Sequence, residues 1–152
     1  MGRCLERLSW LCSALRVATT SDGRTRSPGW LLRLADSSVT YHARYQVGPE
    51  WLPVLDMLVR DLTNPRSLAF QLRGLMDHSD KLEAGHHAFA RPWLQQAQIA
   101  MHKLDVNALN PDDENLQQLL DHLHRTAHTL SDELTLRFFS HASSRSVLSL
   151  VA

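Results

Sequence analysis

The sequence predicts an all-α protein, an up-and-down bundle of about six helices joined by short connections. Apolar residues recur at steps of three and four in segment after segment, which is the spacing of one helix face. No run of β-branched residues alternates with polar residues between Asn-Gly or Asp-Gly turns, as strands would require. A chain of 152 residues fits one core, because two cores would each be marginal. We therefore expect one helical domain over residues 1–142 and a frayed tail over residues 143–152.

The first helix is expected to end near Asp22-Gly23 and to have two contrasting faces. Its apolar face carries Leu5, Leu8, Cys12 and Leu15. Its opposite face carries Arg3, Glu6, Arg7 and Trp10. If both faces pack, Glu6 and Arg7 form a buried or half-buried ion pair between helices, and removal of one partner costs ~3–5 kcal/mol. The alternative is a solvated charged face with one exposed tryptophan.

The next two helices are expected before residue 60. Ser27-Pro28 is typical of a helix start, because serine caps the first turn and proline fits the first helical position. The helix that follows should reach Gly48-Pro49 along one stripe formed by Leu31, Leu34, Ser38, Tyr41 and Tyr45. The stretch from Trp51 to Val59 then predicts a brief helix whose first turn holds Pro53.

Two similar signals, Asn64-Pro65 and Asn110-Pro111, predict the starts of two long helices. Asparagine accepts a hydrogen bond from a free amide of the first turn, and proline lacks an amide that would be unsatisfied there. The first of these helices carries Leu68, Leu72, Leu75 and Leu82. Pro92 opens another helix between them, with Leu94, Ala97, Met101 and Leu104 on one face. The last helix has the longest stripe: Leu116, Leu120, Leu123, Ala127, Leu130, Leu134 and Phe138.

The helix start at Asn64 also predicts a candidate anion-binding site. Free amides and the positive end of the helix dipole would form a cradle with Arg66, Ser67 and Gln71. Capping is the competing interpretation, and it is the one we favour. It accounts for Asn64 and Pro65 but leaves Arg66 and Gln71 unexplained.

Two tyrosines and an arginine on the second helix could also serve either ligand binding or core packing. Tyr41 and Tyr45 lie on its apolar stripe, so their hydroxyl groups need hydrogen-bond partners. Arg44 lies beside them and is able to donate to those hydroxyls. We favour core packing over ligand binding for this group.

Histidine patterns give little support for a metal or catalytic site. Asp121, His124 and His128 share a face of the last helix, and two histidines four residues apart can hold one metal ion. A zinc site needs a third or fourth ligand, which the sequence does not show, so we favour a solvated polar face. There is no Gly-rich phosphate loop and no nucleophile elbow. We expect no metal, no cofactor and no catalytic residue, and the sequence leans against an enzyme.

Composition argues against some classes of partner. Sixteen basic side chains balance sixteen acidic ones, so the basic surface typical of nucleic-acid binders is not expected. No apolar run is long enough to cross a bilayer, which argues against a membrane protein. Cys4 and Cys12 lie eight residues apart in one helical pattern, too far along its axis for a disulfide. Two free thiols and no signal-peptide pattern predict a cytoplasmic protein.

Several phrases resemble the alpha-E domain family, which is named for a helical architecture and a Glu-Arg motif. They are GRCLER from Gly2 to Arg7, YHARY from Tyr41 to Tyr45, VLDMLVRDLTNPRSLAFQL from Val54 to Leu72 and FFSH from Phe138 to His141. The phrase from Val54 to Leu72 is the most specific, and together the phrases span most of the chain. Family members commonly contain two such halves, and this chain is similar to the second, so the resemblance implies a half-domain.

The resemblance implies an accessory role in peptide synthesis or modification, because family members occur with ATP-grasp ligases and transglutaminase-like proteins. We therefore expect a non-catalytic interaction domain. Its partner would be a polypeptide supplying the first half, a second copy of the chain, or a ligase of the ATP-grasp type. The alternative is an enzyme or a small-anion or nucleotide-binding domain, with a pocket between helices formed by Glu6, Arg7, Tyr41, Arg44 and Arg66. A degenerate remnant without activity is a third possibility.

Overall fold

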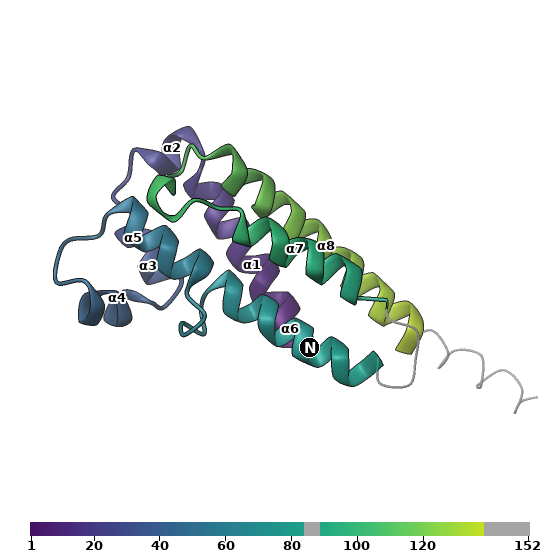
Figure 1. The fold of residues 1–152 in the computed structure, drawn as a ribbon. Helices are drawn as coiled ribbons and strands as arrows, with labels where there is room; N and C mark the ends of the chain where they lie inside the picture. The colour runs from purple at the N-terminus through teal and green to yellow at the C-terminus, as the bar shows by residue number, and fades with distance from the viewer. Residues whose placement is uncertain (84–88, 139–152) are drawn as a thin grey trace, which may run out of the picture.

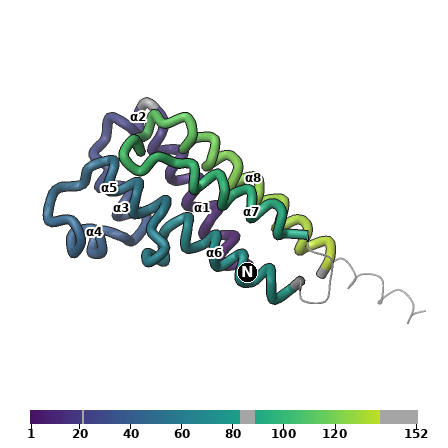
Figure 2. The backbone as a smooth tube through the Cα atoms, viewed as in Figure 1, coloured from purple at the N-terminus to yellow at the C-terminus, as the bar shows by residue number. Residues whose placement is uncertain are grey.

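Four long helices dominate the computed structural model, which describes residues 1–83 and 89–138 (Figure 1). They are α1 (Gly2–Ala18), α6 (Leu68–Glu83), α7 (Arg91–His102) and α8 (Glu114–Phe138). Both α1 and α7 lie against α6 and α8, which closes a ring of four helices. Neighbours in this ring run in opposite directions (Figures 1 and 2). The predicted all-α, up-and-down bundle is therefore confirmed, but the described residues form eight α-helices instead of about six, and four of them make the bundle itself.

Leucine side chains from the long helices fill the core. The predicted stripe on α1 is buried from Leu5 to Leu15, and that on α8 is buried from Leu116 to Leu130. Each fully buried leucine stabilises the fold by ~1.5–3 kcal/mol relative to an exposed one. The core position predicted for Leu82 is wrong, because this side chain is exposed. It lies in the last turn of α6, which extends past the start of α1 (Figure 1).

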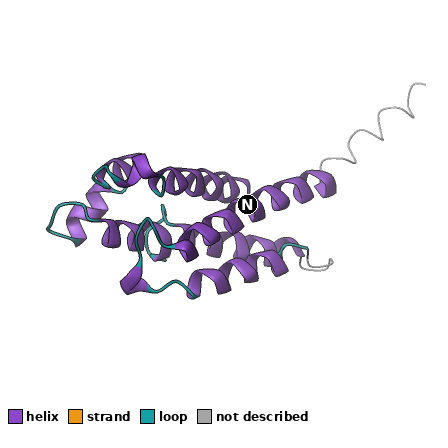
Figure 3. Ribbon diagram, turned by 90° about the horizontal axis from the view of Figure 1, so that it is seen from above, coloured by secondary structure: helices purple, strands orange, loops and turns teal. Residues whose placement is uncertain are grey.

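Several short elements gather at the end of the bundle where α1 ends and α6 begins (Figures 1 and 3). They are α2 (Ser21–Arg24), α3 (Gly29–Leu34), α4 (Ser38–Arg44), α5 (Trp51–Leu55) and a π-helical turn, η1 (Asp56–Arg60). A 3-10 turn, η2 (Val106–Ala108), lies between α7 and α8. The brief helix predicted from Trp51 to Val59 is thus present, as α5 and the π-helical turn that continues it.

The single helix predicted from Pro28 towards Gly48 is wrong, because the chain breaks there into α3 and α4. Asp36 has a φ of 49°, the left-handed conformation that ends many helices. The amides of Asp36 and Ser37 donate to the carbonyls of Arg33 and Leu32 (3.2 and 2.8 Å), which is a Schellman motif. Leu34 lies off the buried face of α3, which carries Leu31 and Leu32, and 49% of its surface is exposed.

Three further predictions concern the end of the first helix, the C-terminal tail and membrane-spanning helices. Helix α1 ends at Ala18, four residues before Asp22, and α2 follows it. The frayed tail predicted over residues 143–152 lies outside the described residues, as does most of the FFSH phrase. Within residues 1–83 and 89–138, no helix is both long and apolar enough to cross a membrane.

Candidate functional site

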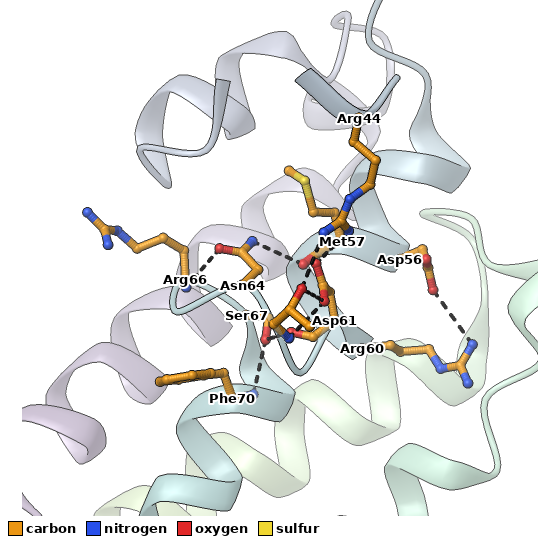
Figure 4. A network of polar contacts seen from close by, with 10 residues as sticks. Arg44, Asp56, Met57, Arg60, Asp61, Asn64, Arg66, Ser67 and Phe70 are labelled. Carbon is orange, nitrogen blue, oxygen red and sulfur yellow. Dashed lines mark hydrogen bonds and ion pairs between the residues drawn. The ribbon is translucent and has the colours of Figure 1, made fainter. Parts of the chain in front are cut away.

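The residues singled out in the sequence separate into two groups. Arg44, Asn64 and Ser67 belong to a network of hydrogen bonds around the turn between η1 and α6 (Figure 4). Gln71 bonds to the same turn, and Tyr41 bonds to the loop that follows α4. The others, Glu6, Arg7 and the guanidinium group of Arg66, lie on the exposed surface. The first group explains how the chain folds locally.

Asn64 ties the π-helical turn to the residues that precede α6. Its side chain is only 3% exposed, and its Nδ2 donates to the carbonyl of Met57 at 3.2 Å. Its Oδ1 accepts from the backbone amide of Arg66 at 3.0 Å (Figure 4). A π-helical turn leaves carbonyls without their usual partners, and the Asn64 amide satisfies one of them.

Ser67, three residues after Asn64, caps α6. Its Oγ accepts from the amide of Phe70 at 3.0 Å and donates to the carbonyl of Asp61 at 2.5 Å. Helix α6 therefore begins at Leu68, and the prediction that Asn64 caps it with Pro65 in its first turn is wrong. The physical reason is that both oxygen and nitrogen of the Asn64 side chain are used before the helix starts.

Gln71 is explained by the same turn. Its Nε2 donates to the carbonyl of Pro65 at 2.6 Å, so the side chain folds back over the start of its own helix. Asn64, Ser67 and Gln71 are thus engaged within the chain, which removes them from the predicted anion cradle. The guanidinium group of Arg66 points away from this turn (Figure 4).

The start of α8 repeats the arrangement. Asn110 accepts from the amide of Asp112 at 2.8 Å, and Asp113 occupies the capping position, accepting from the amide two residues later at 2.9 Å. Gln117 donates back to the carbonyl of Pro111 at 3.4 Å. Both helices therefore begin with the pattern Asn-Pro-x-(Ser or Asp)-x-x-x-Gln. The similarity of the two Asn-Pro signals is confirmed, but each helix begins three residues later than predicted.

Asp61 is the centre of the network, and the sequence alone did not identify it. One carboxylate oxygen accepts from Arg44 Nη1 at 2.6 Å. The other accepts from the amide and the hydroxyl of Thr63 at 2.8 and 2.7 Å. Arg44 Nη2 also donates to Thr63 Oγ1 at 3.3 Å, which closes the group. An Asp followed two residues later by Thr is a known local turn pattern, so the signal was present in the sequence.

The environment lowers the pKa of Asp61. Burial by itself raises this pKa, but the hydrogen bonds from Thr63 and the charge and hydrogen bond of Arg44 outweigh burial. The same contact with Asp61 raises the pKa of Arg44. Because the folded pKa is the lower one, Asp61 stabilises the fold fully above its unfolded pKa of about 3.9. That stabilisation is lost as the pH falls through the folded value.

We predict that Asp61→Asn lowers the free energy of unfolding by ~1–2 kcal/mol at pH 7. The variant loses the charged hydrogen bond to Arg44, and solvent around the exposed guanidinium group screens part of that interaction. Urea unfolding at pH 7 and pH 3 measures the effect, and the difference from the unaltered protein should shrink at pH 3. Asp112→Asn is the control, since its ion pair with Arg24 is largely exposed. An equal loss in both variants would contradict the role given to Asp61.

Tyr41 is fully buried and anchors the loop that follows α4. Its hydroxyl donates to the carbonyl of Gly48 at 3.2 Å and accepts from the amide of Glu50 at 3.3 Å. Its ring lies 4.9 Å from that of Tyr45, centroid to centroid. This agrees with the core-packing interpretation. The partners of the Tyr41 hydroxyl are backbone groups, whereas Arg44 binds Asp61 and also interacts with the side chain of Tyr45.

A shallow groove brings together three of the predicted site residues: Arg7, Arg66 and Gln71. Its volume is about 140 Å³, and it lies between α1, the end of α3 and the turn before α6. Arg66 pairs with Asp36 across it at 2.5 Å. Tyr41 and Arg44 do not line this groove, so the five-residue pocket predicted between helices does not form as a unit.

The two residues of the Glu-Arg motif, Glu6 and Arg7, are both exposed. The buried ion pair was predicted for the case in which a partner packs on this face, so it stays a prediction, and within this chain both side chains face solvent. Trp10, one turn further along α1, is 45% exposed and lines the groove beside Arg7. In the isolated chain this face of α1 is therefore a solvated charged face with one exposed tryptophan.

Two histidines of α8 contact each other, and the acidic residue on the same face pairs with α1. The rings of His124 and His128 touch edge to face, 4.6 Å between centroids, while Asp121 pairs with Arg16 at 3.2 Å. Burial lowers the pKa of His124, and the nearby His128 and Arg16 lower it further against an opposing effect of Asp121. No group of three or more His, Cys, Asp or Glu residues that could hold a metal ion occurs within residues 1–83 and 89–138.

Comparison with known families gives one result. The model of the Alpha-E family, described as a predicted alpha-helical domain with a conserved ER motif, matches residues 1–139. Glu6-Arg7 is the only Glu-Arg pair in the sequence, so it corresponds to that motif. Searches of curated proteins and of solved structures found no match. Because the match covers most of the 152 residues, this chain belongs to the Alpha-E family.

Proposed function

We propose that this chain is a non-catalytic accessory domain of the cytoplasm that docks on a protein partner through the Glu-Arg face of α1. The partner is a peptide ligase of the ATP-grasp type or a related peptide-modifying enzyme. The observation that carries the proposal is the exposure of Glu6, Arg7 and Trp10 on one side of a helix whose other side is fully packed. These residues contribute little to the fold, so their role lies outside it.

The composition of this face suits protein recognition. Trp10 and Leu34 are exposed on the two sides of the groove, 45% and 49% respectively, and Arg7 and Arg66 lie next to them. Tryptophan and arginine are the residues most enriched among those that dominate binding energy at protein interfaces. An aromatic side chain beside guanidinium groups offers both apolar area and charge-assisted hydrogen bonds to one partner segment.

The groove is small, which suits one side chain of a protein partner. Its volume is about 140 Å³. It is also open, since its two apolar walls remain half-exposed. A shallow groove of this kind is completed by the surface of a partner.

The charges of the groove indicate what the partner offers. Asp36 already neutralises Arg66, whereas Arg7 forms no ion pair with any described residue. One uncompensated guanidinium group beside a tryptophan favours a segment with a carboxylate next to an apolar side chain. Complementarity of this type sets orientation and partner choice.

The proposal is tested by measuring, with biolayer interferometry, how the purified chain binds the ATP-grasp-type ligase of the same genome. Arg7→Gln and Trp10→Ala should each weaken binding by ~10-fold or more, because each removes a contact at the centre of the interface. Arg33→Gln and Trp93→Ala are matched controls, since Arg33 is exposed on α3 and Trp93 is 44% exposed on α7. Both controls should bind like the unaltered chain.

Two results would contradict the proposal. One is the absence of binding at micromolar concentrations of chain and ligase. The other is equal weakening by Trp10→Ala and Trp93→Ala, which would show that the Glu-Arg face is not special. Light scattering on the chain alone distinguishes a second copy as the partner, because a dimer that Trp10→Ala dissociates would place self-association on this face.

The alternative proposal is a small-anion or nucleotide-binding site at the groove lined by Arg7 and Arg66, with Glu6, Tyr41 and Arg44 outside it. It has less support, because Tyr41 and Arg44 are engaged with Gly48, Glu50 and Asp61. Thermal unfolding with phosphate, nucleotides and amino acids tests it, since a ligand that binds only the folded state raises the midpoint.

A further inference from the structure

A second hollow, separate from the groove beside the Glu-Arg motif, lies between η1, α6 and α7. Its volume is about 210 Å³, and none of its lining residues lines the groove. For comparison, a dry cavity of about 150 Å³ is large enough to bind benzene. This hollow therefore has room for a ring-sized apolar group.

The wall of this hollow is apolar where it meets the core. It is formed by Ala69 and Leu72, which are buried, and by Met76 and Met101. Methionine side chains are flexible and polarisable, so they adapt to the shape of an apolar or aromatic group. A hydrocarbon group would therefore pack favourably against this wall.

The rim of the hollow is positively charged. Arg60 and Arg73 both line it, and none of its lining residues is Asp or Glu. Arg73 forms no ion pair with any described residue, and Arg60 has only a long one, 3.6 Å from Asp56. That separation exceeds the length of a good hydrogen bond, so the Arg60 guanidinium group keeps donors available.

We propose that this hollow binds a small organic carboxylate whose body is an aromatic or branched hydrocarbon group. The body would lie against the two methionines, and the carboxylate would receive hydrogen bonds from Arg73 and Arg60. Arginine presents two parallel donors that match a carboxylate. A monoanion fits better than a phosphate dianion, because Asp56 offsets part of the charge of Arg60 and leaves about one uncompensated charge.

The four methionines of the chain provide a local readout for this proposal. In a protein labelled with 13C at the methionine methyl groups, Met76 and Met101 report on the hollow, whereas Met1 and the buried Met57 report on the rest. The probe is 3-phenylpropanoate, titrated against the full chain. We expect saturable shifts of Met76 and Met101 with a Kd on the order of 1 mM, and no shift of Met57.

Variants separate a built site from a general apolar surface. Arg73→Gln should raise the Kd at least ~5-fold, and Lys81→Gln, exposed on the same helix but outside the hollow, should leave it unchanged. Gln98→Trp, at an exposed rim position, should block binding without altering the core. Near-identical spectra of free Arg73→Gln and free unaltered protein would show that the variant folds.

Related probes define the ligand class and its source. The neutral 3-phenylpropanamide should bind at least ~5-fold more weakly than the acid, and phenyl phosphate should bind no more tightly than the acid. N-acetyl-phenylalanine distinguishes a peptide carboxyl terminus, which it mimics, from a free acid that binds alone. No shift of Met76 and Met101 at 20 mM acid (~20 times the expected Kd), or equal affinity for acid and amide, would overturn the proposal.

Discussion

Replacement of Leu120 by alanine is expected to lower the free energy of unfolding by ~2–5 kcal/mol. Leu120 is fully buried on α8 and belongs to the longest apolar stripe in the sequence. Its truncation removes apolar contacts and leaves a cavity that close-packed neighbours fill only in part. A loss of this size is a large share of the ~5–15 kcal/mol that stabilises a typical domain.

Leu136→Ala on the same helix is the matched control, because Leu136 is 62% exposed. It should change the free energy of unfolding by no more than ~0.5 kcal/mol. Urea unfolding followed by circular dichroism measures both variants. Equal losses, or a tolerated Leu120→Ala, would contradict the helical register described for α8.

Replacement of Asn64 by alanine is expected to cost ~2–4 kcal/mol. The variant leaves the Met57 carbonyl and the Arg66 amide without partners, and each unsatisfied buried group costs ~1–3 kcal/mol. Water cannot readily replace the lost side chain, because Asn64 is almost completely buried. The loss should appear in urea unfolding and in faster amide exchange at the start of α6.

Asn110→Ala is the matched control for this variant. Asn110 makes corresponding bonds to its own turn, to the amide of Asp112 and the carbonyl of Ala108. Unlike Asn64, it is exposed, so water can take over both bonds. We expect a loss of ~0.5–1 kcal/mol. A larger loss for Asn110→Ala than for Asn64→Ala would show that burial does not set the difference.

The long helices were predictable from sequence because their stabilisation comes from one continuous apolar face. The stripe on α8 holds helical spacing from Leu116 to Leu130, and all five of its core positions are buried. Periodicity fails where the chain turns instead of continuing. At Asp36 a left-handed residue splits one stripe into two helices, and an Asp at that position carries no signal as strong as glycine.

The candidate site was predicted in part. Sequence reasoning placed Asn64, Ser67 and Gln71 near one helix start, but it could not tell which residue caps the helix. That choice depends on the Met57 carbonyl, which the π-helical turn presents to Asn64. Asp61 was missed because its main partner, Arg44, is seventeen residues away in sequence and is brought near by the fold.

The segment from Asp61 to Gln71 stabilises the fold through its hydrogen bonds. The side chains of the Glu-Arg motif, Glu6 and Arg7, are exposed, and we propose that they serve a partner instead of the fold. The most direct test is the free energy of unfolding of the double variant Glu6→Gln, Arg7→Gln. We predict a value within ~0.5 kcal/mol of the unaltered chain, because both side chains are exposed. A loss of ~2 kcal/mol or more, comparable to that of Asn64→Ala, would make the motif structural and contradict the claim.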